Sequence, residues 1–307
     1  MPEWSVTEPL KLTLDDPVTA LRVRIVGGTV NVVGTDDDTA RLEVTALHGP
    51  PLIVTHEDAT LTVAYEDLSW KGFLSWLAPK GRNRAAVVSL AVPAGASVEV
   101  GVVAAGAVVS GIRGRTEVRG VTGDTTLVGL SGPVRAETVS GSVEAQSVTG
   151  DLRFTSVSGD LTVVDGSGAS VRADSVSGDM VVDLDPDGSG SPADVRLTSV
   201  SGEVAVRLPH RTDARVEANT TSGAVANAFD GLRVSGAWGA KHITGTLGAG
   251  TGTLKATTVS GAIALLRRPE PTDEPDERAE PAEPVPAVGE DITEEPAVTD
   301  APSGKVL

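Results

Sequence analysis

The sequence predicts an all-β fold, a single-chain parallel β-solenoid (β-helix). Three observations predict it. A Ser-Gly or Thr-Gly pair recurs every nine residues between positions 122 and 168, apolar and polar residues alternate between the pairs, and only 3% of residues are aromatic although 40% are hydrophobic. A fixed period indicates stacked repeats, alternation indicates half-buried strands, and small β-branched side chains suit thin layers. The pairs begin at Thr122, Ser131, Ser140, Thr149, Ser158 and Ser167, then at Ser177, Ser201, Ser222, Thr244 and Ser260.

Each nine-residue unit reads as one strand and one corner. In 158–166, Leu161 and Val163 alternate with polar Thr162. Two units would form a flattened coil of about 18–20 residues that rises by one strand spacing, about 4.8 Å. The glycine of each pair is expected to adopt a positive φ and so turn the chain. A β-sandwich with a coincidental repeat is the alternative, but hairpins usually turn at Asn-Gly or Asp-Gly.

The chain divides into three predicted regions. Residues 1–96 alternate like strands without the nine-residue step, so they form an irregular β N-terminal cap or the irregular start of the stack, with an aromatic-basic insertion at 65–84. Residues 97–266 form the β-solenoid repeat domain. Residues 267–307 are rich in Pro and Glu and have no apolar period, which predicts a disordered acidic C-terminal tail.

Charge and composition exclude several classes of function. The net charge of −17 argues against nucleic-acid binding, which favours clustered Lys and Arg. The lack of cysteine excludes disulfides, Cys-ligated zinc and a thiol nucleophile. No secretory signal is visible, and no apolar stretch approaches the roughly 20 residues of a membrane span. We therefore expect a cytoplasmic protein, in one interpretation peripheral at the inner face of the membrane.

The side chains that could carry chemistry do not form a recognisable site. Asp36–Asp38 and the aspartates of the Ser-Gly-Asp corners, Asp160 and Asp179, suggest calcium, but the calcium-binding nonapeptide has paired glycines that are missing here. These aspartates are expected to accept hydrogen bonds from backbone amides at turns. No cofactor, metal site or catalytic residue is predicted, and the protein is not expected to be an enzyme. None of the four histidines has the spacing of paired metal ligands. They are His48, His56, His210 and His242.

One segment has an unusual composition. Aromatic and basic side chains gather in 65–84, where four bases occur between positions 71 and 84. The segment is interpreted either as a hydrophobic plug on the solenoid or as an interfacial patch that contacts anionic lipid. The candidate interaction patch comprises Trp70, Lys71, Phe73, Trp76, Lys80, Arg82 and Arg84.

The repeat also carries a family resemblance. The segments VVSGIRGRTEV (108–118), SVSGDLTV (156–163) and SVSGDM (175–180) align on one motif. With this motif, residues 20–266 resemble the bacterial putative-adhesin family of β-strand-repeat proteins, a domain of unknown function. The resemblance implies a β-solenoid without catalytic residues, and for some relatives an association with cell-envelope stress systems.

The predicted function is that of a non-enzymatic β-repeat scaffold or binding protein of unknown ligand, which mediates protein–protein interaction or self-association. Stacked coils leave terminal strand edges that pair readily unless capped. One alternative is a membrane-surface accessory protein in cell-envelope stress signalling. A second is a polysaccharide-binding or polysaccharide-acting β-helix protein, which is less favoured because the outward positions read as a plain mixture of Thr, Glu, Arg and Ser.

Overall fold

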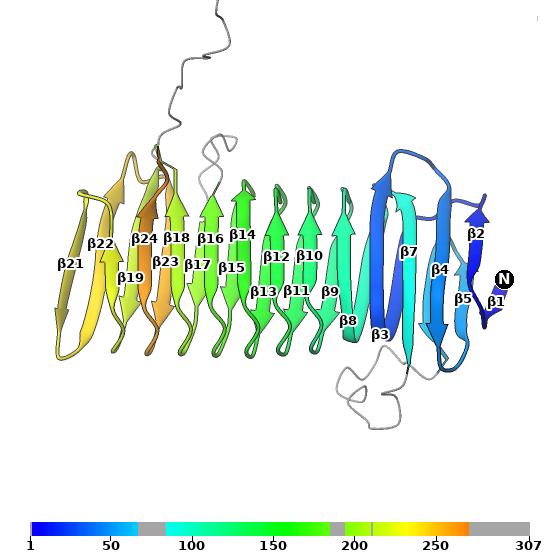
Figure 1. The fold of residues 1–307 in the computed structure, drawn as a ribbon. Coiled ribbons are helices and arrows are strands. Elements are labelled where there is room, and N and C mark those ends of the chain that lie inside the picture. Colours follow the sequence, from blue (N-terminus) through cyan, green and yellow to red (C-terminus); the bar gives the residue numbers. More distant parts are fainter. Residues whose placement is uncertain (1, 67–83, 185–193, 210, 270–307) are drawn as a thin grey trace, which may run out of the picture. The chain divides into compact units, whose positions relative to one another are not determined.

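The computed structural model describes residues 2–66, 84–184, 194–209 and 211–269, and every regular element in these ranges is a β-strand (Figure 1). The predicted all-β class is therefore confirmed. The predicted tail lies outside the described residues from position 270 onward, and so does the insertion over 67–83. The described residues contain no helix that could serve as a membrane span.

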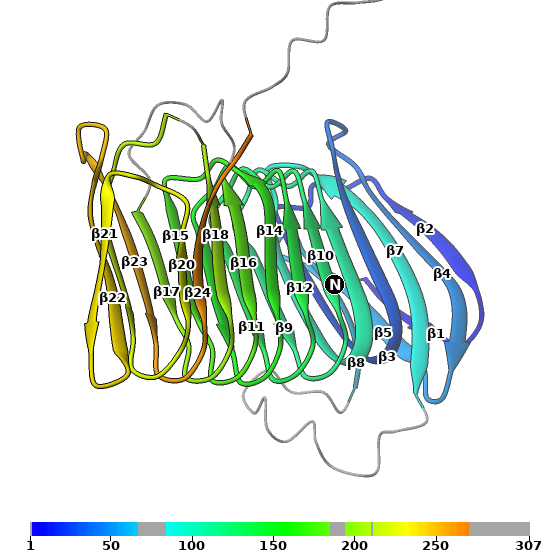
Figure 2. The same ribbon diagram turned by 60° about the vertical axis from the view of Figure 1, so that its left-hand side comes forward.

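Two stacks of parallel strands face each other across one core in the middle of the unit (Figure 2). The first stack contains β9 (Thr116–Gly120), β11 (Val134–Thr138), β13 (Leu152–Ser156), β15 (Ser170–Asp174) and β17 (Asp194–Thr198). The second contains β10 (Thr125–Val128), β12 (Val143–Gln146), β14 (Leu161–Gly166), β16 (Met180–Leu184) and β18 (Val204–Leu208).

The register confirms the predicted solenoid. Val143 pairs with Leu161, 18 residues later, and Leu161 pairs with Met180 after 19 more. Within a strand, alternate side chains are buried: Leu152 and Phe154 of β13 enter the core, and Arg153 between them is exposed. The period of two in the sequence thus becomes one apolar layer between the stacks.

The corner glycines serve a purpose different from the expected one. Gly141 and Gly159 do not have positive φ, so the predicted left-handed turn is wrong at these positions. A Cβ atom on Gly159 would lie 2.1 Å from the carbonyl oxygen of Gly141, and one on Gly141 would lie 2.1 Å from that of Gly123. Glycine is required because the backbones of successive coils approach too closely for any side chain.

Hydroxyl groups connect these corners from coil to coil. Ser158 Oγ donates to the carbonyl oxygen of Val139 in the preceding coil, at 3.2 Å, and the amide of Gly159 donates to the buried Ser156 Oγ at 2.7 Å. The aspartate of the motif also bridges coils, because Asp160 Oδ1 accepts from the amide of Asp179 at 2.9 Å. The prediction that the aspartates accept from backbone amides is confirmed for Asp160 and Asp179, whereas Asp36 and Asp37 accept from the side chains of Arg113 and Arg41.

At the N-terminal end, two long strands run through both stacks. They are β3 (Ala20–Thr35) and β8 (Ser97–Ser110), which pair in parallel. On its other side β3 pairs with β6 (Thr60–Tyr65) and β7 (Ala85–Pro93), also in parallel. Antiparallel strands complete this end: β5 (Leu52–Glu57) and β1 (Glu3–Val6) on the first stack, β4 (Ala40–His48) and β2 (Leu10–Leu14) on the second.

At the C-terminal end, the order of strands in space departs from the order in sequence. β23 (Gly252–Thr258) and β24 (Ile263–Arg267) insert as a coil between β17/β18 and the earlier strands β19 (Ala214–Thr220) and β20 (Val225–Asn227). The first stack then ends in an antiparallel hairpin, β22 (Ala240–Leu247) and β21 (Leu232–Ala237). Among the described residues, the second stack ends at the three-residue β20.

Candidate interaction surface at the C-terminal end

Only one residue of the predicted aromatic-basic patch is described. The guanidinium of Arg84 lies over the ring of Tyr65, 5.5 Å from its centroid. Tyr65 is buried, and this burial raises the pKa of its hydroxyl, although the charge of Arg84 acts in the opposite direction. Arg84 therefore packs against the core. The other six lie outside the described residues: Trp70, Lys71, Phe73, Trp76, Lys80 and Arg82.

The described histidines do not converge on one site. His56 is buried, with Nε2 3.3 Å from the carbonyl oxygen of Pro17, and His242 Nδ1 lies 2.7 Å from Asn219 Oδ1 on the neighbouring strand. His48 is exposed at the end of β4, and His210 lies outside the described residues. In the part of the chain that the structure describes, no three His, Asp or Glu side chains are grouped as a metal site requires.

The last strand of the first stack presents an open edge. β21 pairs with β22 on one side, and no described strand pairs with its other side. Five of its six residues are exposed, and only Leu232 is buried. Backbone N–H and C=O groups along such an edge remain available to another strand.

The core beneath this edge is incompletely covered. Val234 lies opposite Ile243 of β22, which itself lies opposite Ala218 of β19, so all three belong to the inward register of the first stack. Ile243 and Ala218 are fully buried, but 53% of Val234 is exposed. Among the described residues, the opposite stack ends two strands earlier, at β20, and Val234 is consequently an inward-facing side chain without an opposing strand.

The corner below Val234 is nevertheless well ordered by hydrogen bonds. The side-chain amide of Asn227 donates to the carbonyl oxygens of Phe229 at 2.9 Å and Leu232 at 3.3 Å, and its Oδ1 accepts from the amide of Phe229 at 3.0 Å. Phe229 is buried, and the Arg267 guanidinium lies 5.1 Å from its ring centroid. These contacts fix the backbone that leads into β21, the exposed strand.

A fully exposed tryptophan occupies the turn of the terminal hairpin. Trp238 and Gly239 join β21 to β22 with φ values of 56° and 93°, the pattern of a two-residue type I′ turn. Glycine, asparagine and aspartate are usual in such a turn, because a bulky side chain at positive φ is strained. Trp238 is neither buried nor favoured locally.

An exposed apolar ridge leads to the same turn. At four corners, on successive coils, a valine stands between two Ser or Thr residues. Each of these valines is 46–51% exposed. A Cβ atom on Gly239 would lie 3.7 Å from the carbonyl oxygen of Thr221, the corner residue of the outermost coil. Polar Thr221 therefore separates the last valine of the ridge from the turn that carries Trp238. The valine ridge consists of Val157, Val176, Val200 and Val259.

Sequence reasoning did not identify this surface. The segment SGAWGAKH (235–242) lacks the residue spacing of a phosphate loop and contains no other recognisable chemical motif. The available signal was the Trp-Gly pair between two alternating runs, which is typical of a hairpin turn. The exposure of Val234 had no local signal, because it depends on where the opposite stack ends.

The fold and this end define the class of protein: a parallel β-solenoid whose first stack, within the described residues, ends in a strand with an unpaired edge. Residues 123–266 match the model of the family described as Toastrack DUF4097, which confirms the predicted resemblance to a β-repeat domain of unknown function. No curated protein matches the chain.

Among the solved structures that are similar to this chain, two share 10–11% sequence identity with it. One is a "putative cell adhesion protein" from Clostridium sporogenes, with 11% identity over 85% of this chain and 100% of that chain and a TM-score of 0.31. The other is a "putative lipid binding protein" from Parabacteroides distasonis, with 10% identity over 86% of this chain and 98% of that chain and a TM-score of 0.39. The scores are low, and we draw no functional conclusion from either protein.

Proposed function

We propose that this protein is a non-enzymatic scaffold that associates with a second copy of itself through the C-terminal end of the stack. The observation that carries the proposal is the open edge of β21, beside a half-exposed core residue and a fully exposed tryptophan.

The edge has little protection against pairing. Edge strands are usually blunted by charges, proline or a bulge. The sequence of β21, LRVSGA, has one charge, at Arg233, and no proline. Two such edges can pair antiparallel about a two-fold axis, an isologous contact in which each copy uses the same patch. Pairing would satisfy the backbone groups and cover Val234 on both copies.

The experiment is size-exclusion chromatography with light scattering on the full chain over a range of concentrations. We expect a dimer. Val234→Lys places a charge on the edge and should shift the chain to monomer. Trp238→Gly should weaken association about tenfold by removing buried apolar area, and it should not destabilise the monomer because glycine relieves the positive φ.

The matched control is Val181→Lys on the outward face of β16, a valine of similar exposure in the middle of the second stack. It should leave the dimer intact. A wild-type chain that stays monomeric at all concentrations would refute the proposal. An equal loss of association in Val181→Lys and Val234→Lys would show that added charge, not the edge, controls the assembly.

A further inference from the structure

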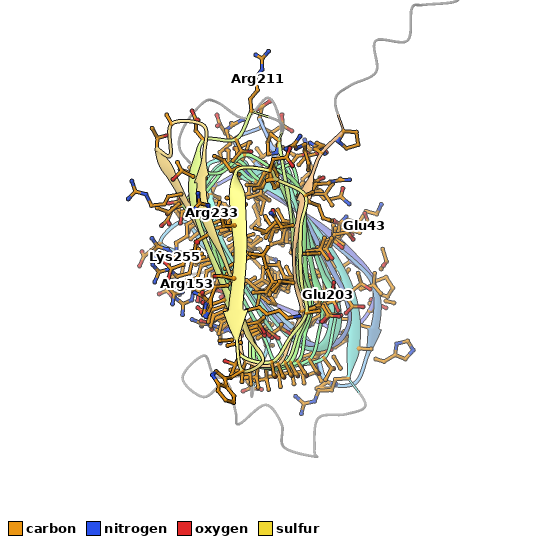
Figure 3. The ribbon with its side chains drawn as sticks, turned by 90° about the vertical axis from the view of Figure 1, so that its left-hand side faces the viewer. Glu43, Arg153, Glu203, Arg211, Arg233 and Lys255 are labelled. Carbon is orange, nitrogen blue, oxygen red and sulfur yellow. The ribbon has the colours of Figure 1, made fainter. Side chains whose placement is uncertain are left out.

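Five basic side chains form a straight row across the outer face of the first stack. Parallel pairing places them at the same register position on β11, β13, β15, β17 and β23. With strands about 4.8 Å apart, the row extends over roughly 19 Å. Figure 3 shows two of its members on one side of the unit, with Glu43 and Glu203 on the other. This basic row consists of Arg135, Arg153, Arg172, Arg196 and Lys255.

The row has defined ends and is not explained by stability. The next residue in register is Glu117 before Arg135 and Glu217 after Lys255. Like charges directly opposite on neighbouring strands destabilise a sheet, and a chain with a net charge of −17 has no general excess of bases. The expected plain mixture of outward residues is thus wrong for this face, where the bases are sorted into one line.

Neighbouring acids neutralise only part of the row. Arg172 pairs with Asp194 at 3.0 Å, and Lys255 pairs with Glu217 at 3.0 Å. Arg135 is bound by Glu137 on its own strand. Arg153 and Arg196 are exposed and make no ion pair within the described part of the chain. Two members are therefore available to an incoming anion without breaking an existing contact.

Arginine also dominates a surface pocket beside the row. The pocket has a volume of about 250 Å³, and it brings Arg115 next to three members of the row, with a single acid, Asp151. The planar guanidinium binds carboxylate or phosphate through two parallel hydrogen bonds, which an ammonium group cannot do. Arg115 pairs with Glu117 at 3.4 Å, so among the four arginines around this hollow only Arg153 holds no ion pair within the described residues, and it is the one that an oxyanion can bind directly.

The flanking positions indicate what kind of molecule carries the anions. The rows on either side of the bases hold acids and hydroxyls, among them Asp151 and Ser170 on one side and Thr155 and Asp174 on the other. Carboxylates and hydroxyls accept hydrogen bonds from the hydroxyl groups of a ligand. The outward side chains of β9 to β17 and β23 include no aromatic ring on which a base could stack.

We propose that the basic row binds a linear acidic polysaccharide with one carboxylate per sugar, as in a polyuronate. The chain would cross the strands, with its carboxylates on the arginines and its hydroxyls on the flanking acids and threonines. A pyranose ring with its linkage is about as long as one strand spacing of about 4.8 Å, so the chain would advance by about one sugar per coil, and the carboxylates on its sheet-facing side would meet the arginines. This surface is separate from the edge of β21, and the proposal extends beyond self-association.

The test is titration calorimetry of the full chain with oligogalacturonates of increasing length. Because five bases lie between two acids, affinity should increase up to about five sugars and then level off. Binding should weaken with salt, since charged contacts carry it. Dextran, which has no carboxylate, should not bind. Absence of binding to any oligogalacturonate would overturn the proposal, as would tighter binding to polyphosphate, duplex DNA or anionic vesicles.

Two variants locate the binding surface. Arg153→Gln with Arg196→Gln removes charges that hold no internal ion pair, so the fold should be kept and affinity should fall at least about tenfold. Arg153→Lys keeps the charge but cannot form the two parallel hydrogen bonds of a guanidinium, and it should reduce the affinity by less. The control is Arg211→Gln, an exposed arginine off the row (Figure 3). Equal weakening by Arg211→Gln would show nonspecific charge attraction and refute the site.

Discussion

The two ends of the stack are closed to different extents. At the N-terminal end, antiparallel strands cover both stacks. Of the inward residues of the outermost strands, Val6 on β1 and Leu14 on β2 are buried, and Trp4, Leu10 and Leu12 are partly buried against the core. At the C-terminal end, an antiparallel hairpin covers only the first stack, and the inward residue Val234 is half exposed. Antiparallel pairing therefore closes a solenoid only where the opposite stack extends equally far.

The edges also differ in chemistry. The outer strand β2 at the N-terminal end carries Lys11, which pairs with Glu43 of β4 at 2.9 Å, and proline precedes β1. The edge strand β21 has glycine, serine and alanine in its second half. Charge and proline at the N-terminal end disfavour pairing with another strand. The small residues of β21 leave its edge accessible to one, in keeping with the proposed self-association.

Both ends can be compared with the regular coils between them. The largest loss of stability is expected from a substitution in these coils. Gly159→Ala would place a Cβ atom 2.1 Å from the backbone oxygen of Gly141, which cannot move without displacing the next coil. We expect a loss of about 3 kcal/mol in the free energy of unfolding, measured by chemical denaturation.

Gly95→Ala is the matched control for this substitution. A Cβ atom there has nothing within 4 Å, and Gly95 is not at positive φ. The change should alter stability by about 0.5 kcal/mol or less, in the stabilising direction. A similar cost for Gly95→Ala and Gly159→Ala would mean that backbone approach between coils is not why glycine occupies the corners.

The comparison of the ends makes the next largest prediction. Leu14→Ala should cost about 2 kcal/mol, because it opens a cavity under β2. Val234→Ala in the monomer should cost less than about 0.5 kcal/mol, because its side chain is already half in water. Denaturation below the dimerisation concentration measures both. Equal costs would contradict the view that only the N-terminal end is closed.

The sequence was informative where structure depends on local pattern. Alternation around Leu161 and Val163 and the nine-residue step predict the strands, the coil length and the inward side chains. Arrangement over longer distances was not accessible. The basic row joins Arg172 to Arg196 across 24 residues and Arg196 to Lys255 across 59, with β19 to β22 in between. No fixed period marks these residues as neighbours.

The corner glycines show a second limit. A glycine that permits positive φ and a glycine that permits close backbone approach look identical in sequence. Only the stacking of Gly141 under Gly159 distinguishes them. Likewise, the open end exists because β23 and β24 lie between β17/β18 and β19/β20, so that the order in space differs from the order in sequence. No local sequence pattern predicts this arrangement.

The smallest predicted effect compares a carboxylate within the coils with one near the open end. Burial raises the pKa of Glu137, but the hydrogen bonds and charges of Arg135 and Arg119 lower it by more, and the result lies below the usual value. The pKa of Glu217 is lowered by the hydrogen bond and charge of Lys255, in full contact with solvent. Screening by water makes the second pair a negligible source of stability.

A lowered folded-state pKa contributes stability that is present above the unfolded value of about 4.3 and is lost as pH falls through the folded value. Glu137→Gln should therefore lower the melting temperature at pH 7 by about 2 °C, and the difference from the wild type should shrink as pH approaches 3. Glu217→Gln should leave the melting temperature unchanged at both pH values. A difference for Glu137→Gln that grows on acidification would reverse the sign of this linkage and show that the arginines do not favour the charged form.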